Sequence, residues 1–191
     1  MLSQETLKKL QLEQEKLDNF IWENYCKRNN INDDKVGKTK EAFIRSKIAL
    51  FVEIGELANE LKTFKHWKSQ KDINWDKVKE ELIDCLHFFL SWANSLQIDF
   101  SNYRVQNLSG VTDYNELILS LFSETELFPL GISQDDDWLE RVKNEKNQET
   151  FYRWLMIFEE LCQKLGMSEN DIKNEYMAKN RINWERQQKK Y

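Results

Sequence analysis

The chain has 191 residues, of which 40% are hydrophobic and 32% charged, and its formal net charge is −5. This length supports one domain over residues 1–191 with a sizeable core, while the negative charge argues against general nucleic-acid binding. A single proline and five glycines provide few of the turn residues that many short strands would need, so we expect an all-α fold.

Three helices are predicted in the first half of the chain. The first runs from about Ser3 to Arg28 and is amphipathic. The second begins with Thr39 as its N-cap and runs through apolar positions that include Ile48 and Val52. The third, from Trp75 to about Leu96, is apolar nearly all round its second half, which is typical of a buried helix.

Further helices are predicted in the second half. Thr112 would cap a fourth helix that stops at Pro129. An amphipathic helix over residues 151–165 follows, and Ser168 with Asp171 resembles a capping box that opens the last helix. We therefore expect a bundle of about six helices.

Two pairs of carboxylates lie within apolar stretches of the second and third helices. Residues at positions i and i+3 share a helix face, so Glu53 with Glu56, and Glu81 with Asp84, would each project as a pair. Neither stretch contains Lys or Arg, and a charge in apolar surroundings is costly without a partner. Because hard divalent cations prefer oxygen ligands, four convergent carboxylates predict a divalent-metal site.

Each pair alone is a weak indication, because acidic residues three apart are common on exposed helices. A core histidine bonded to a backbone carbonyl is at least as good an interpretation of His87 as metal ligation. A di-iron bundle would need a second Glu-x-x-His motif, but Thr63 stands three positions before the other histidine, His66. Oxygen-only ligation therefore favours magnesium.

Basic residues follow the second helix and gather at the end of the chain. Residues 173–191 hold six Lys or Arg against two Glu, a local charge of +4. Lys65 and Lys68 alternate with Phe64 and Trp67, which suits phosphate contact and stacking on a base, although a polar helix end and core aromatics are the ordinary alternatives. A basic end folded over carboxylates is what a metal-bridged polyphosphate needs.

Several of these motifs resemble those of the dimeric dUTPases, members of the all-α NTP pyrophosphohydrolase superfamily that includes MazG-like enzymes. Residues 14–18, Gln-Glu-Lys-Leu-Asp, resemble the family's Gln-x-x-Leu-Asn segment that reads the uracil edge, with Asp18 in place of Asn. Residues 53–68 are similar to the metal-binding motif with its Trp-Lys-x-Trp-Lys extension, in which Phe64 replaces the first Trp. Residues 81–89 resemble the second metal-binding motif.

The end of the chain carries the most specific resemblance. Residues 176–191 look like the family's Tyr-x-x-Lys-Asn-x-Leu-Asn-x-Phe-Arg-Gln-x-x-Gly-Tyr motif, which holds the phosphates and the sugar. Trp184 replaces Phe, and Lys190 stands where Gly is usual. Residues 98–167 match only in helical character. The terminal motif favours a dUTPase over a MazG-like protein.

The resemblance implies a homodimeric enzyme that hydrolyses dUTP to dUMP and pyrophosphate with a metal-activated water. Two or more Mg²⁺ ions would be held by Glu53, Glu56, Glu81 and Asp84, and Glu53 or Glu56 would act as general base. The substrate would contact a larger set of residues: Gln14, Asp18, Lys65, Trp67, Lys68, His87, Phe88, Lys179, Asn180, Asn183, Arg186, Lys190 and Tyr191.

Other interpretations stay open. A MazG-like pyrophosphohydrolase would accept several nucleotides, and dUDP is a further candidate substrate. In a different class, the helices would form an interaction module, and some phage members of the family also bind a repressor of mobile genetic islands. The three cysteines have no CxxC spacing and no apolar stretch could span a bilayer, so we expect a cytoplasmic protein with reduced thiols and no membrane contact.

Overall fold

The computed structural model describes residues 2–31, 40–67, 73–104, 113–128 and 145–189. Over these residues it contains helices and no strands, which confirms the all-α prediction and the expected number of about six helices. The helices are α1 (Gln4–Asn29), α2 (Lys40–Leu61), α3 (Trp75–Ser95), α4 (Tyr114–Glu126), α6 (Glu145–Lys164) and α7 (Glu169–Gln188).

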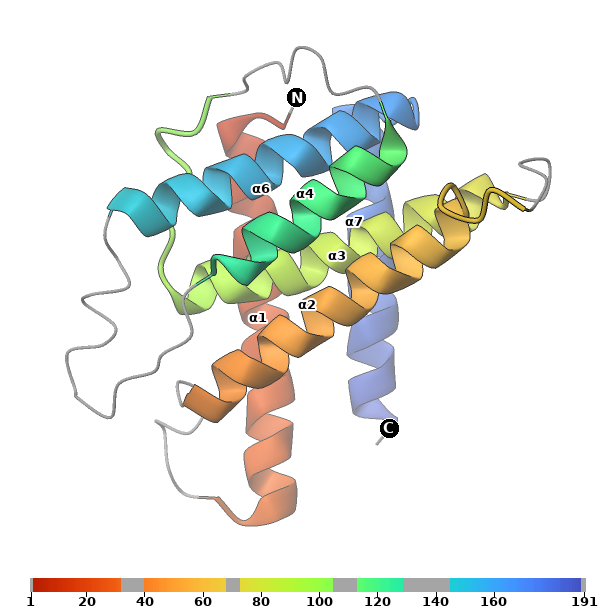
Figure 1. Cartoon of the computed structure of the whole chain (residues 1–191). Coiled ribbons are helices and arrows are strands. Elements are labelled where there is room, and N and C mark those ends of the chain that lie inside the picture. Colours follow the sequence, from red (N-terminus) through yellow and green to blue (C-terminus); the bar gives the residue numbers. More distant parts are fainter. Residues whose placement is uncertain (1, 32–39, 68–72, 105–112, 129–144, 190–191) are drawn as a thin grey trace.

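Helix α3 lies at the centre of the bundle and contacts α1, α2, α6 and α7. Figure 1 shows α2 crossing in front of α3, α4 beside α6, and α1 and α7 running behind. Helices α1 and α7, from opposite ends of the chain, also contact each other. Side chains from the beginning, middle and end of the sequence can therefore meet beside α3.

Short polar residues start several helices by accepting backbone hydrogen bonds that the first turn leaves free. Ser3 caps α1 and Asn74 caps α3, and Ser168 with Asp171 forms the predicted capping box at α7. The cap of α4 is Asp113, whose carboxylate accepts from two backbone N–H groups, so the cap lies one residue after the predicted position. The predicted boundary residues Thr39, Thr112 and Pro129 lie outside the described residues.

An aromatic core packs between α3 and α6. The ring of Phe89 stacks on Trp154 at 4.1 Å between centroids, and Phe128 stacks on Phe151 at the same distance. The buried indole of Trp154 donates to the hydroxyl of Thr125 at 3.0 Å. Burial of each such side chain contributes about 2 to 3 kcal/mol, so this core holds α3 firmly in place.

Helix α2 buries a lysine while two of its apolar residues are exposed. Ile48 and Val52 are 57% and 48% exposed, whereas Lys47 is only 5% exposed. The ammonium of Lys47 donates to the carbonyl oxygen of Glu126 at 2.6 Å, and this contact satisfies an acceptor at the C-terminal end of α4. None of the described helices has the length and apolarity needed to cross a membrane.

Candidate active site

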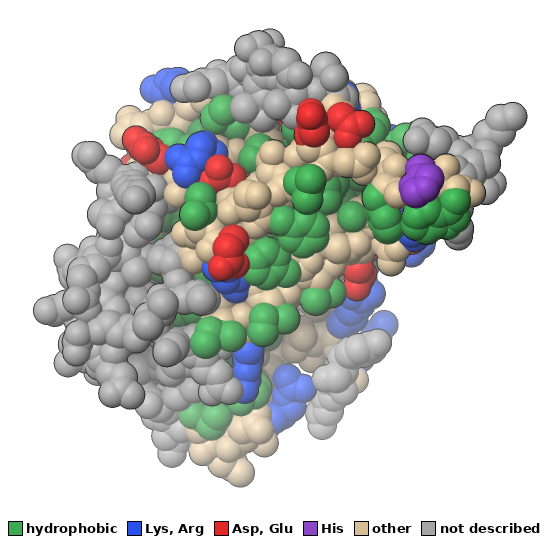
Figure 2. All heavy atoms as spheres, in the orientation of Figure 1, with side chains coloured by type: hydrophobic (Ala, Val, Ile, Leu, Met, Phe, Trp, Pro, Cys, Tyr) green, Lys and Arg blue, Asp and Glu red, His purple; other side chains and the backbone are tan. Residues whose placement is uncertain are grey.

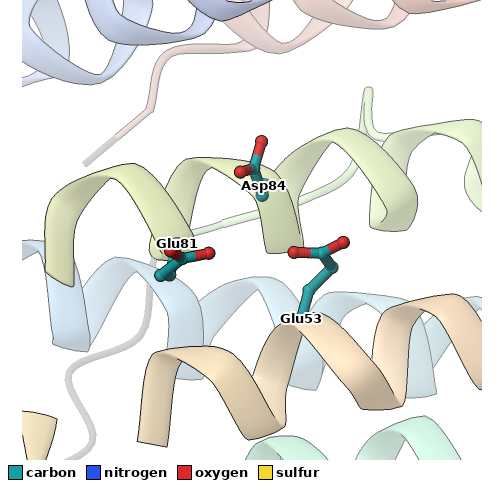
Figure 3. A group of neighbouring side chains, drawn as sticks. All are labelled: Glu53, Glu81 and Asp84. Carbon is teal, nitrogen blue, oxygen red and sulfur yellow. The ribbon is translucent and has the colours of Figure 1, made fainter. Parts of the chain in front are cut away.

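Three carboxylates converge between α2 and α3. Figure 3 shows Glu53 reaching from α2 toward α3, where Glu81 and Asp84 stand on neighbouring turns. Each offers a carboxylate oxygen, and these oxygens lie within 4.8 Å of one another. Glu56, the fourth predicted ligand, is exposed and lies outside this group. The structure thus brings together three of the four predicted carboxylates.

The carboxylates hold their negative charge at a cost. Burial, followed by the charges of Asp84, Glu56 and Glu81, raises the pKa of Glu53 from its ordinary 4.5 to about 7. Burial and neighbouring carboxylates also raise the pKa of Glu81. The charge of Glu56 contributes to both shifts, so this residue is close enough to act on the group. All-oxygen donors with excess negative charge fit a hard divalent cation such as Mg²⁺.

Lys179 of α7 partly offsets this charge. Its ammonium donates to Asp84 Oδ2 at 2.5 Å and to Glu80 Oε1 at 3.2 Å. Burial lowers the pKa of Lys179, but the hydrogen bond and the charge of Asp84 outweigh burial, so its net pKa is raised and it stays charged. Burial raises the pKa of Asp84 more than the hydrogen bond from Lys179 lowers it. One lysine therefore leaves the three carboxylates incompletely balanced.

A cavity of about 360 Å³ opens beside these groups. This volume lies within the range of small-molecule sites, which run from about 300 to 1,000 Å³. Four helices contribute to its walls, and the lining residues are Gln14, Leu17, Asp18, Ile21, Glu53, Asp84, His87, Phe88, Ser91, Lys179, Asn183, Arg186 and Gln187. One end of the cavity carries both acidic and basic side chains, while the other end carries amide, imidazole and aromatic groups.

A buried hydrogen-bond chain orders this second end. Gln14 Oε1 accepts from the hydroxyl of Tyr176 at 2.6 Å and lies 2.8 Å from Nδ1 of His87. The rings of His87 and Tyr176 stack with centroids 4.0 Å apart. Burial, and then the charge of Lys179, lower the pKa of His87 to about 3, so the imidazole is neutral at physiological pH.

Asp18 extends this series of hydrogen bonds toward the cavity. Gln14 Nε2 donates to Asp18 Oδ1 at 2.8 Å. Burial raises the pKa of Asp18 to about 6, although hydrogen bonds from Gln14 and Ser91 lower it. This carboxyl is thus far closer to neutrality at physiological pH than an ordinary aspartate.

The structure places most of the predicted contact residues at the cavity and leaves three described ones away from it. Lys65 donates to Asn59 at 2.6 Å, and the side chain of Trp67 is 66% exposed. Asn180 is buried beside Tyr176 rather than lining the cavity, whereas Asn183 lines it. The remaining predicted contacts, Lys68, Lys190 and Tyr191, lie outside the described residues.

Sequence reasoning missed several polar residues of the site, in addition to the lining residues Leu17, Ile21 and Gln187. Ser91 lines the cavity, Tyr176 orients Gln14, and Glu80 shares the ammonium of Lys179. Ser91 follows His87 by four residues, so the helical period alone places both on one face. Tyr176 opens the terminal motif, but its contact with Gln14 could not be predicted because Gln14 lies far away in the sequence, and Glu80 had no signal at all.

Comparison with known protein families gives one match over nearly the whole chain. The family model described as dUTPase matches residues 6–191, a range that includes every helix lining the cavity. Searches of curated proteins and of solved structures returned no match.

Proposed function

Because the chain belongs to the dimeric all-α dUTPase family and is therefore a dUTP pyrophosphatase, we propose that its cavity binds dUTP and releases dUMP and pyrophosphate in a Mg²⁺-dependent reaction. The observation that carries this proposal is that one cavity has a carboxylate-rich end and an end with amide, imidazole and aromatic groups. Three carboxylates have oxygens within 4.8 Å of one another, and two of them, Glu53 and Asp84, line a cavity whose other end carries Gln14, Asp18 and His87. A metal-bridged triphosphate suits the first end and a pyrimidine suits the second.

The acidic end would hold the cofactor. Glu53, Glu81 and Asp84 are the proposed ligands, with Glu56 as a further ligand from the sequence. Bound Mg²⁺ would neutralise charge on the triphosphate and lower the pKa of water. Glu53 is the better candidate for the general base, because it lines the cavity whereas Glu56 is exposed and does not.

Basic side chains of α7 would bind the phosphates. Lys179 and Arg186 both line the cavity, and the planar guanidinium of Arg186 can bind phosphate oxygens in pairs. Asn183 lines the same wall as Gln187, one helical turn before it, which supports the proposal that it contacts the deoxyribose. These contacts stabilise negative charge that moves onto the leaving pyrophosphate.

The outlying predicted contacts remain part of the proposal. Lys65, Lys68, Trp67, Asn180, Lys190 and Tyr191 are expected to contact substrate by resemblance alone. Contact between α1 and α7, together with their shared cavity, supports the proposal that residues 1–191 act as one domain.

A homodimer is also proposed, and an apolar surface supports it. Ile48 and Val52 of α2 and Leu119 of α4 are 57%, 48% and 64% exposed. Stacking of Phe51 on Phe122 joins the two helices beneath this surface, and Figure 2 shows hydrophobic side chains gathered over it. Large exposed apolar patches mark interaction sites. Sedimentation of the purified chain as a monomer at micromolar concentration would contradict this proposal.

The proposed activity is tested by pyrophosphate release from dUTP, dCTP, dTTP and dATP, each with Mg²⁺ and with a chelator. We expect release from dUTP alone, and only with Mg²⁺; dUDP is assayed separately by phosphate release. Equal turnover of all four triphosphates would favour a MazG-like enzyme. Absence of both turnover and Mg²⁺-dependent nucleotide binding would favour the interaction module, including the repressor-binding alternative.

A further inference from the structure

The polar end of the cavity is rich in hydrogen-bond acceptors. Gln14 Oε1 already accepts from Tyr176, and Gln14 Nε2 donates to Asp18, so the orientation of this amide is determined. An oxygen acceptor cannot donate, so the His87 nitrogen that faces Gln14 Oε1, Nδ1, must carry the proton. Nε2 of His87 is then a bare acceptor, and it is buried without a hydrogen-bond partner in the described part of the chain.

A uracil base needs more donors than this arrangement offers. Its pairing edge presents a carbonyl oxygen, the N3–H donor and a second carbonyl oxygen, so one acceptor of the protein suffices for the single N–H. His87 Nε2 can serve as this acceptor once entry of the base uncovers it, because this nitrogen is buried in the free chain. An ionised Asp18 would add a second acceptor with a full negative charge, and a uracil carbonyl facing it would be repelled.

Protonation of Asp18 resolves the mismatch. A neutral carboxyl has one O–H that can donate to a uracil carbonyl, while its Oδ1 keeps the hydrogen bond from Gln14. Cytosine presents the opposite pattern, with an exocyclic amino donor and an unprotonated N3, and an ionised carboxylate accepts from that amino group. The protonation state of Asp18 thus decides which pyrimidine matches the site.

We propose that Asp18 takes up a proton when the base enters the cavity, donates it in a hydrogen bond to a uracil carbonyl, and so selects uracil over cytosine. The inference rests on the proposed function and deepens it. It assigns to this chain a pH-dependent specificity that an amide at the same position would not have.

The charged surroundings of Asp18 are compatible with this uptake. Burial, together with the charge of Glu15 on the same helix, raises its pKa to about 6 against the hydrogen bonds from Gln14 and Ser91. Other titratable or charged groups at the cavity are Glu53 of α2, Asp84 and His87 of α3, and Lys179 and Arg186 of α7. His87 and Tyr176 do not titrate near neutrality, because burial lowers the pKa of the imidazole to about 3 and raises that of the phenol.

The experiment is calorimetry of 2′-deoxyuridine binding to the full chain with saturating Mg²⁺ between pH 6 and pH 8, in buffers of different ionisation enthalpy. The nucleoside has no phosphate, so its own titration does not interfere. If only the neutral form of Asp18 binds, affinity falls roughly 50-fold from pH 6 to pH 8, and close to one proton is taken up per site above pH 7. Binding of 2′-deoxycytidine should not weaken over this range.

Two variants identify the group that takes up the proton. Asp18→Asn should bind deoxyuridine without proton uptake and with little pH dependence, and more tightly than the unmodified chain at pH 8. Glu15→Gln is the matched control, because Glu15 is an exposed carboxylate on the same helix that does not line the cavity; proton uptake should persist in this variant.

Proton uptake that persists in Asp18→Asn, that disappears in Glu15→Gln, or that is absent from the unmodified chain overturns the inference. If dUTP is hydrolysed while deoxyuridine binding is independent of pH, the inference alone fails. If no nucleoside binds and dUTP is not hydrolysed, the proposed function fails with it.

Discussion

Two faces of helix α3 carry opposite chemistry. On one face, Phe89 stacks on Trp154 and Trp92 packs edge-on against Phe128. On the other face, Glu81 and Asp84 point toward Glu53 of α2. His87, also on this face, has a buried ring nitrogen without a hydrogen-bond partner among the described residues. The apolar face is satisfied within the fold, whereas the polar face keeps charges and an acceptor that a ligand can satisfy.

The comparison shows how one helix separates stability from function. Side chains three and four positions apart share a face, so Glu81, Asp84, His87 and Ser91 can all serve the site without entering the aromatic core. The core holds the helix, and the helix holds the carboxylates close together despite their repulsion. We therefore expect substitutions on the two faces to affect different measurements.

The largest expected effect is on the apolar face. Phe89→Ala removes a fully buried ring and should lower the free energy of unfolding by about 3 to 5 kcal/mol, as measured by urea denaturation. Phe64→Ala is the matched control, because Phe64 is 48% exposed, and it should cost less than about 1 kcal/mol. Equal losses in the two variants would remove the distinction between core and surface on which the comparison depends.

The next effect is on the polar face and concerns activity. Asp84→Asn removes a carboxylate of the three-residue group and should lower kcat/KM for dUTP about 100-fold, with the free energy of unfolding changed by less than about 1 kcal/mol. Glu80→Gln also loses a contact with Lys179 but lies outside the group, so its loss should stay under about fivefold. Similar losses of activity would indicate that Lys179, rather than the carboxylate group, accounts for the effect.

The smallest effect should be a gain in stability. The pKa of Glu53 is raised to about 7 in the folded chain, so ionisation of Glu53 destabilises the fold as pH rises above its ordinary 4.5, and the penalty is complete above about pH 7. In a chelator, Glu53→Gln should therefore raise the free energy of unfolding by about 1 kcal/mol at pH 8, after allowance for solvent screening, and by little at pH 4.5.

The matched control for this gain is Glu23→Gln. Glu23 is an exposed carboxylate of α1 paired with Lys27 at 3.6 Å, and its substitution should change stability by only a few tenths of a kcal/mol. Addition of Mg²⁺ should stabilise the unmodified chain more than Glu53→Gln. A loss of stability in Glu53→Gln at pH 8 without metal would show that the polar face is not under electrostatic strain.

Local patterns predicted much of this protein. The all-α class and the capping box at Ser168 followed from composition and short-range chemistry, and the motifs led to the dUTPase family. Patterns did not show which of two similar residues reaches the cavity. Asn183 lines it while Asn180 is buried, and Glu53 joins the carboxylate group while Glu56 remains exposed.

The sequence by itself determined which side chains share a helix face, because helical periodicity is a property of neighbours along the chain. Only the tertiary structure decided which face each helix turns inward, since that depends on packing partners far away in the sequence. Lys47 is buried while Ile48 is exposed because α4 ends beside α2. In the same way, α7 brings Lys179 and Tyr176 to α3 and α1, and this packing turns two acidic stretches into one side of a nucleotide-sized cavity.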